Sequence, residues 1–228
     1  MVDATILSYY LNMRRFGKIP TSWSPELAYA IGLLATDGSL SKDGRHIDFT
    51  SKDLEQVENL IKCLAVPNKI GTKKSGASNI AYRVQIGDVK FYKFLANLGL
   101  MPNKSKILGP LNIQKDYFFD FLRGFFDGDG SSYAYWDPRW KSSYMFYMCF
   151  ASASKNHIEW LRSEIFMYAS LKGHVSKSQK KGCYELRYAK TEATILAKKI
   201  YESKPSICLR RKYLKIMQSL SIIATHYQ

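Results

Sequence analysis

The sequence predicts an α+β fold made of two similar halves. Residues 24–38 and 116–130 each read as an apolar helix with an interior glycine that ends in Asp-Gly. The two aspartates, Asp37 and Asp129, occupy the same place in this pattern. After each motif the apolar residues alternate as in strands and then return to helical spacing, twice over. Each half therefore reads αββαββα, and the repeat predicts two pseudo-symmetric halves.

The first half begins at Ser24, a favoured N-cap residue, and Pro25 takes the favoured first helical position. Alternating strand residues follow at HIDFTS, and helical spacing returns in LEQVENLIKCLA. Two short strands are predicted at 69–74 and 80–87, and a helix at 88–98.

The second half repeats this order from Asp116, which is predicted to cap its first helix. MCFASASKN and HIEWLRSEIFMYA supply the strand and the helix, followed by strands at 173–179 and 183–189 and a helix at 191–202. The hairpin after this second motif is expected to be the longer one.

These patterns divide the chain into four parts. Residues 1–23 form an N-terminal extension with one short helix expected over TILSYYLNMRRF, and residues 24–100 form the first repeat. Residues 101–115, which contain two prolines, form a linker. Residues 116–228 form the second repeat and end in a basic segment.

The charge of the chain points to a polyanionic partner. The 228 residues carry 34 Lys and Arg against 19 Asp and Glu, a formal net charge of +15. A hydrophobic content of 46% excludes a disordered chain. No run approaches the roughly 18 apolar residues of a membrane span, and no signal peptide is visible. We expect nucleic acid as the partner, no membrane association, and a cytoplasmic, nucleoid-associated or organelle-matrix location rather than secretion.

The repeated motif predicts a pair of carboxylates. Both motif helices are apolar on more than one face, which indicates burial, and Gly32 and Gly124 allow another helix to approach closely. If these helices pack in parallel, Asp37 and Asp129 adjoin at two negative helix ends. A bound Mg²⁺ resolves this conflict, because it prefers oxygen ligands and also binds phosphate. Asp-Gly is also an ordinary turn dipeptide, but two copies at matched positions favour a site.

AIGLLATDG (30–38) and LRGFFDGDG (122–130) resemble the two motifs of the LAGLIDADG homing endonucleases in their single-chain, two-repeat form. The resemblance implies that the motif helices pack in parallel between the halves, and that each half offers a curved antiparallel DNA-binding sheet. It implies a monomer that cuts both strands of double-stranded DNA for intron homing. Mg²⁺ is the expected cofactor, with Mn²⁺ as a substitute and Ca²⁺ binding without efficient turnover.

The resemblance also implies roles for individual residues. Asp37 and Asp129 would be the metal-binding catalytic acids, and the residues just before them, Thr36 and Gly128, would offer backbone carbonyls. The sixth motif position is Ala35 in one copy and Asp127 in the other, so Asp127 is not expected to be a ligand. A basic residue is implied near each active site: Lys104 in PNKS, and Lys212 in LRRKY, with Arg211 as the alternative.

Strand alternation predicts which residues read DNA. The inward residues Val84 and Ile86 leave Arg83 and Gln85 facing the groove, and the same pattern selects Glu185 and Arg187. The remaining predicted contacts lie on strands and basic hairpin tips: Ser39, Ser41, Lys42, Arg45, His46, Asp48, Thr50, Lys73, Lys74, Ser131, Tyr133, Tyr135, Arg139, Lys141, Lys177, Lys180 and Lys181. Because the halves differ at these positions, a long asymmetric target is expected.

The function predicted is a metal-dependent, site-specific endodeoxyribonuclease. The main alternative is a nucleic-acid-binding protein on the same fold that does not cut, such as an intron maturase or a transcription regulator. Two further alternatives are an endonuclease domain detached from an intein and a structural basic protein. Neither accounts for the sequence as well, since no splicing-domain signature is visible and a structural protein needs no paired acids.

Overall fold

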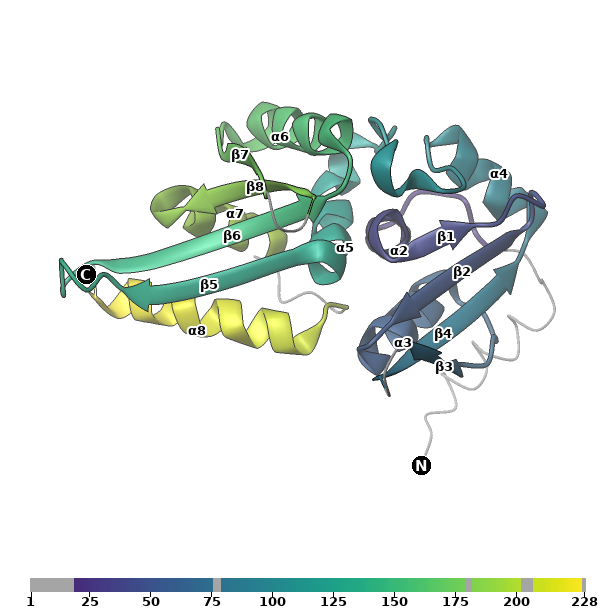
Figure 1. The fold of residues 1–228 in the computed structure, drawn as a ribbon, viewed down its shortest axis with the longest axis horizontal. Coiled ribbons are helices and arrows are strands. Elements are labelled where there is room, and N and C mark those ends of the chain that lie inside the picture. Colours follow the sequence, from purple (N-terminus) through teal and green to yellow (C-terminus); the bar gives the residue numbers. More distant parts are fainter. Residues whose placement is uncertain (1–18, 76–78, 179–181, 202–206, 227–228) are drawn as a thin grey trace.

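The computed structural model describes residues 19–75, 79–178, 182–201 and 207–226. These residues form two halves side by side, each with a four-stranded antiparallel sheet and its own helices (Figure 1). The predicted α+β class with two similar halves is confirmed. The predicted helix in the N-terminal extension lies outside the described residues, and the domain boundaries stay predictions.

The two halves repeat the same order of elements. The first contains α2 (Pro25–Thr36), β1 (Gly38–Leu40), β2 (His46–Ser51), α3 (Leu54–Leu64), β3 (Gly71–Ser75), β4 (Asn79–Gly87) and α4 (Val89–Asn97). Two 3₁₀ turns follow, η1 (Lys104–Lys106) and η2 (Lys115–Tyr117). The second contains α5 (Phe118–Asp129), β5 (Gly130–Trp136), β6 (Tyr144–Ser152), α6 (Lys155–Ala169), β7 (His174–Lys177), β8 (Tyr184–Ala189), α7 (Lys190–Tyr201) and α8 (Arg210–His226).

The sheets also share their strand order and register. The order is β1-β2-β4-β3 in one half and β5-β6-β8-β7 in the other. Gly38 pairs with Phe49, and Gly130 pairs with Phe150, so both motifs feed their sheets in the same register. The repeat seen in the sequence is therefore a repeat of structure.

The motif helices α2 and α5 pack against each other at the centre of the molecule. A Cβ on Gly32 would lie 2.2 Å from the carbonyl oxygen of Phe121, and a Cβ on Gly124 would lie 2.1 Å from that of Tyr29. Only glycine permits this approach of two backbones. Gly128 likewise abuts Thr36, and the ordered series of contacts shows that the helices run parallel, as the sequence predicted.

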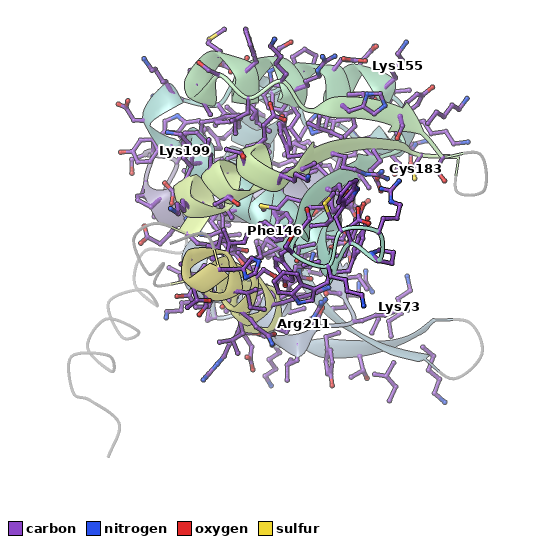
Figure 2. The ribbon with its side chains drawn as sticks, turned by 90° about the vertical axis from the view of Figure 1, so that its left-hand side faces the viewer. Lys73, Phe146, Lys155, Cys183, Lys199 and Arg211 are labelled. Carbon is purple, nitrogen blue, oxygen red and sulfur yellow. The ribbon has the colours of Figure 1, made fainter. Side chains whose placement is uncertain are left out.

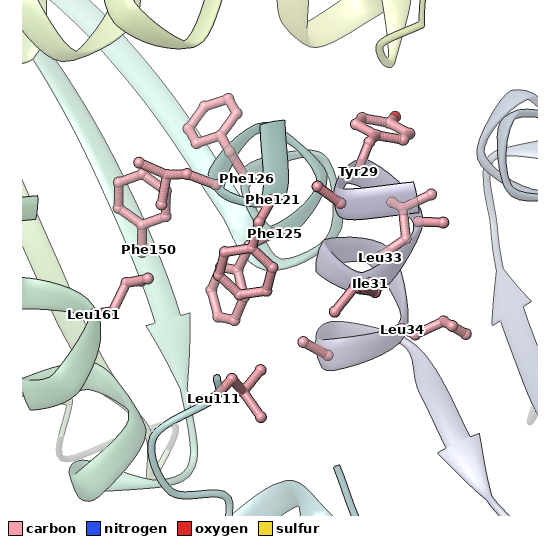
Figure 3. Close-up of a cluster of buried hydrophobic side chains, with 14 of the residues drawn as sticks. Tyr29, Ile31, Leu33, Leu34, Leu111, Phe121, Phe125, Phe126, Phe150 and Leu161 are labelled. Carbon is pink, nitrogen blue, oxygen red and sulfur yellow. The ribbon is translucent and has the colours of Figure 1, made fainter. Parts of the chain in front are cut away.

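Each motif helix also contributes large buried side chains to the hydrophobic core of its own half. Figure 3 shows Phe121, Phe125 and Phe126 of α5 on one side of the helix pair and Leu33 and Leu34 of α2 on the other. All five are almost completely buried. Burial of such large apolar side chains stabilises each by about 1.5–3 kcal/mol relative to exposure. The helix pair thus joins two cores into one.

The start of the second motif helix differs from the prediction. Ser24 caps α2, since its hydroxyl accepts from the Leu27 amide at 3.1 Å. Asp116 does not cap α5: it lies inside η2, and Tyr117 takes the N-cap position without a side-chain hydrogen bond. The prediction was wrong because a 3₁₀ turn leads directly into α5 and satisfies part of its first turn by backbone bonds.

The basic C-terminal segment forms a long helix. Residues Arg210–His226 make up α8, which runs alongside β5 (Figure 1). Lys215 Nζ donates to the Ser132 carbonyl at 2.5 Å, and the His226 ring lies 2.9 Å from the Ser142 carbonyl. None of the described helices combines the length and apolar character needed to cross a bilayer.

Candidate active site and nucleic-acid interface

The two motif acids lie at the ends of the paired helices. Asp37 is the C-cap of α2, and its amide donates to the Leu33 carbonyl. Asp129 is the last residue of α5, so each acid directly precedes the first strand of its sheet. Asp37 is half-buried and Asp129 is exposed.

The acids carry negative charge that the surrounding protein only partly compensates. Burial and, next in size, repulsion from the Asp129 carboxylate raise the pKa of Asp37 to about 6, against the opposing effect of Lys104 and Lys212. Desolvation also raises the pKa of Asp129. Such mutual repulsion is what a bound cation relieves.

Lys104 serves the first motif from the linker. Its side chain is buried, and its ammonium group donates to the carbonyls of Thr36 at 2.9 Å and Gly38 at 2.5 Å. Burial lowers the pKa of Lys104 to about 8, although Asp129 and Asp37 favour its charged form. The Lys104 ammonium group therefore interacts electrostatically with both Asp37 and Asp129.

Lys212, in the first turn of α8, occupies the matching place on the second motif. Its ammonium group reaches the carbonyls of Gly128 at 3.0 Å and Gly130 at 2.6 Å, the counterparts of Thr36 and Gly38. Burial lowers its pKa to about 8 as well. Arg211 instead points to Asp53, with 2.6 Å between the guanidinium and the carboxylate. Lys212 is thus the structural counterpart of Lys104.

The residues at the helix ends fit a divalent cation. Among the described residues no three carboxylate, histidine or cysteine side chains form a metal-binding group, so the protein offers two carboxylates and backbone carbonyls. Mg²⁺ is commonly held by one or two carboxylates and completes its shell with water and phosphate. The carbonyls of Thr36 and Gly128 accept from the lysines, but a carbonyl oxygen has a second lone pair.

A hollow of about 350 Å³ opens beside Asp37 and Gly128. Its wall comes from the junction of β2 and α3 and from the start of β4. Asp37 therefore lines an accessible depression in the surface, together with Gly128 of the second motif. Its lining residues are Asp37, Thr50, Ser51, Lys52, Asp53, Gln56, Ile80, Ala81 and Gly128.

Asp127 ties the two halves of the protein together. Its carboxylate is fully buried and accepts from the Tyr29 hydroxyl at 2.7 Å, the Tyr201 hydroxyl at 3.2 Å and the Leu209 amide at 2.6 Å. These donors come from α2, α7 and the residues before α8. Both carboxylate oxygens of Asp127 are thus occupied by protein donors, and whether Asp127 binds metal stays a prediction.

Sequence reasoning missed the contacts that join the two halves beside the site. Gln56 of α3 is buried, and its amide donates to the Asp127 carbonyl while its oxygen accepts from the Ser51 hydroxyl at 2.5 Å. Asn59 donates to the Cys208 carbonyl at 3.0 Å. Neither polar residue belongs to the repeated motif. Their positions on the apolar side of a predicted helix were the only available signal.

The first sheet presents the predicted residues on its helix-free face. Ile47, Phe49, Val84 and Ile86 are buried, while the neighbouring Gln85 is exposed. Arg83 is only half-buried, and its Nε donates to Asp48 at 2.7 Å, which ties two predicted DNA contacts to each other. His46, Thr50 and Ser41 on this face are half-buried, and Ser39 is exposed.

The second sheet presents the corresponding face. Ser131, Tyr133 and Tyr135 are exposed along β5, and Arg187 is exposed on β8. The Arg187 guanidinium donates to Glu185 at 2.5 Å, so these two predicted contacts also form an ion pair. Sequence reasoning missed Tyr147, which shares this face because Phe146 and Met148 on either side of it are buried.

Exposed cations lie at the hairpin tips. Figure 2 shows Lys73 and Cys183, which mark the β3–β4 and β7–β8 hairpins, toward the same side of the molecule, with Lys199 on the other side. Lys180 and Lys181 lie outside the described residues. The described tip cations are all exposed: Lys42, Arg45, Lys73, Lys74, Arg139, Lys141 and Lys177.

The first half of the chain resembles a known domain family. Residues 24–99 match the family model of the LAGLIDADG-like domain. This match covers the first of the two halves. The second half repeats the fold of the first, and the two halves together match the two-domain fold of solved LAGLIDADG structures. Comparison with curated proteins by sequence gave no match.

Solved structures show the same LAGLIDADG fold at low identity. The homing endonuclease I-WcaI bound to its DNA recognition sequence is 16% identical, with 95% of this chain and 94% of that chain covered and a TM-score of 0.61. An I-DmoI variant in complex with its target DNA in the presence of Mg is 16% identical, with 78% and 96% covered and a TM-score of 0.50.

A third similar structure is not named as an endonuclease. Full-length DUF199/WhiA from Thermatoga maritima is 15% identical, with 90% of this chain covered and a TM-score of 0.55. The present chain spans only 63% of the length of that protein. The LAGLIDADG fold alone therefore does not decide between cutting and binding.

Proposed function

We propose that this protein is a site-specific DNA endonuclease of the homing type. It would act as a monomer, make a double-strand break in a long asymmetric target, and hydrolyse phosphodiesters with a divalent metal, Mg²⁺ in the first place. The observation that carries this proposal is the pairing of Asp37 and Asp129 at adjoining helix ends, each motif with its own buried lysine.

Each residue of the site has a chemical task in this proposal. Asp37 and Asp129, with the carbonyls of Thr36 and Gly128, would hold the metal. When bound, Mg²⁺ supplies activation of water and stabilisation of charge on the phosphate under attack. Lys104 and Lys212 keep two positive charges fixed beside the acids, where negative charge develops in the transition state. Their contacts to backbone carbonyls hold these charges in place before DNA arrives.

The fold supports DNA as the substrate. Two sheets with helix-free faces flank the acids, and exposed cations surround these faces. Antiparallel strands fit the major groove, where all four base pairs are distinguishable. Because the two sheet faces carry different side chains, they would recognise different base sequences in the two halves of the target. The likeness to I-WcaI bound to its DNA recognition sequence agrees with this assignment.

The alternative is a protein that binds nucleic acid without cutting. The likeness to WhiA favours it, because that fold match is about as good as those to the endonucleases. A binding protein, however, has no need for two carboxylates forced together at helix ends. The retention of both acids together with both lysines supports cutting.

A cleavage selection on a randomised duplex DNA library with Mg²⁺ tests the proposal. We expect a small set of related long sequences to be cut on both strands, with the break near the centre of an asymmetric consensus. Recovery of bound but intact duplexes would overturn the nuclease assignment in favour of the binding protein.

A further inference from the structure

Three tyrosines form a continuous aromatic surface on the helix-free face of the second sheet. Tyr133 and Tyr135 lie on β5, and Tyr147 lies on β6 directly opposite Tyr133. The ring centroids of Tyr133 and Tyr147 are 4.7 Å apart with 16° between the planes, and those of Tyr135 and Tyr147 are 6.1 Å apart at 15°. These three residues are called the tyrosine face below.

The tyrosine face is exposed and uncharged. Tyr133 is 37% and Tyr135 is 45% exposed. Arg187, the cation that acts on Tyr133 and Tyr147, is paired with Glu185 at 2.5 Å. Burial raises the pKa of Tyr147 to about 12, so its phenol stays neutral at physiological pH. The three rings therefore offer apolar contact and a few hydroxyl groups but no net charge.

The matching positions in the first half carry no tyrosine. Ser41 donates its amide to the His46 carbonyl at 2.9 Å, and this pair corresponds to Tyr133 and Tyr147 in the repeat. Beside it lies the charged pair of Asp48 and Arg83. One sheet thus presents small polar and charged groups, while the other presents stacked aromatic rings.

The stacking decides how the rings can meet nucleic acid. Because Tyr133 and Tyr147 stack at 4.7 Å, each ring covers a face of the other, and the pair directs ring edges outward. Open faces suit the unstacked bases of a single strand. Edges suit the major groove of a duplex, where thymine alone among the four bases presents a methyl group. Guanine and cytosine lack this methyl group, and leaving their polar groups against apolar ring edges costs hydrogen bonds.

We infer that the tyrosine face reads thymine methyl groups in the major groove of one half-site of a duplex DNA target. This inference rests on the proposed function only in requiring duplex DNA binding and does not depend on cutting. It makes the second half-site thymine-rich and its recognition apolar, while the first half-site is read through charge and hydrogen bonds.

Replacement of thymine by deoxyuridine tests the inference, because it removes only the methyl group. A randomised duplex library is first selected for binding with Ca²⁺ in place of Mg²⁺. The selected duplex is then prepared with deoxyuridine in one half-site or in the other. We expect affinity to fall about threefold to fourfold for each contacted methyl group in one half-site alone, in line with the burial of one methyl-sized group.

Variants assign that half-site to the tyrosine face. The double variant Tyr133→Ala and Tyr147→Ala is expected to lose the sensitivity to deoxyuridine, whereas Tyr147→Phe, which keeps the ring edge, retains it. Phe166→Ala removes an exposed ring from α6 on the opposite side of the sheet and is the matched control. Thermal unfolding of each variant separates lost recognition from lost folding.

Three outcomes would overturn the inference. If the duplex binds equally well with deoxyuridine in either half-site, the tyrosine face does not read methyl groups, and the proposed DNA binding stands. If single strands of the selected sequence bind better than the duplex, the rings act as a stacking platform instead. If no duplex is retained at all, the proposed function fails together with the inference.

Discussion

Two aspartates of the second motif, two residues apart, have different surroundings and different tasks. Asp129 is exposed at the end of α5 and carries charge that no neighbour fully compensates. Asp127 is fully buried and accepts three hydrogen bonds. The helix turns the two carboxylates to different sides, one toward the candidate site and one into the protein.

Removal of the Asp127 carboxylate should destabilise the protein without affecting the candidate site. Asp127→Ala leaves three buried donors unpaired, which costs about 2–5 kcal/mol of unfolding free energy. Asp127→Asn keeps an acceptor and should cost less than the alanine variant. Urea unfolding measures both. Loss of cleavage in a folded Asp127→Asn variant would contradict the structural role.

His157 makes stability depend on pH. Burial lowers the pKa of His157 to about 4 from the ordinary 6.5, and its Nδ1 lies 2.8 Å from the Gly109 carbonyl. Below pH 6.5 the unfolded chain binds a proton that the native state does not, so stability falls as the pH falls toward 4.

His157→Gln, which installs the residue found at the matching position 56, should remove that part of the pH dependence. The shift corresponds to a loss of up to about 3 kcal/mol between neutral pH and about pH 4 in the original protein. Urea unfolding across this range measures the difference, and His174→Gln, which removes an exposed histidine, is the control. Parallel curves for the original protein and His157→Gln would show that His157 titrates normally.

The sequence predicted those site residues that belong to the repeated motifs and missed those that do not. Asp37, Asp129 and Lys104 stand in motifs that the sequence itself displays. Gln56 and Tyr147 do not, because their importance arises from a partner that the chain brings close only on folding. The sequence left Lys212 and Arg211 open, and the geometry separates them: Lys212 reaches the motif carbonyls, whereas Arg211 pairs with Asp53.

At the scale of elements, the pair of motif helices is the part of the fold that tolerates least change. The two helix backbones lie so close that no side chain fits between them. Glycine at positions 32 and 124 makes this close approach possible. The helix ends carry the acids, so the packing of α2 on α5 also sets the separation of Asp37 and Asp129.

Gly32→Ala and Gly124→Ala are therefore expected to be strongly destabilising. Alanine in a helix ordinarily stabilises by about 1 kcal/mol relative to glycine. Here its Cβ would lie within about 2.2 Å of a backbone oxygen, and the helices must separate. We expect a loss of more than about 3 kcal/mol, or no folded protein.

Gly109→Ala is the matched control for this prediction. Nothing lies within 4 Å of the position its Cβ would take. Its thermal midpoint should stay close to that of the original protein. A Gly32→Ala or Gly124→Ala variant with an unchanged midpoint would contradict the observed approach of the two helices.

The helices and strands were predictable because the hydrophobic pattern changes between helical and strand spacing in the same order in both halves. The strands and helices downstream of both motifs lie where alternation and helical spacing placed them. The exceptions are local: η2 replaces a side-chain cap at Asp116, and α8 forms from a segment whose basic composition masks its apolar contacts. Tertiary packing on β5, which the sequence does not display, stabilises that helix.

At the scale of the whole molecule, the charge of +15 surrounds a small acidic centre. Cations at the hairpin tips extend around both sheets, while Asp37 and Asp129 lie between the halves. Such a distribution attracts a long polyanion and leaves one point at its centre for metal. The net charge alone predicted a polyanionic partner, but only the repeated motif predicted the pair of acids between the halves.

The hairpin cations should determine the salt dependence of DNA binding. The double variant Lys73→Gln and Lys74→Gln is expected to lower the slope of log affinity against log salt by about two, one for each lost phosphate contact. Lys198→Gln with Lys199→Gln, on exposed positions of α7, is the control of equal charge. Equal slopes for the two double variants would show that the β3–β4 hairpin does not contact phosphates.

The most direct test of the nuclease assignment is cleavage of the selected target by Asp37→Asn and Asp129→Asn with Mg²⁺. Each substitution removes a charge while keeping the size of the side chain. If the two acids share the metal chemistry, either variant loses double-strand cleavage by several orders of magnitude and still binds the target within about threefold of the original affinity. Full double-strand cutting by either variant would contradict the assignment.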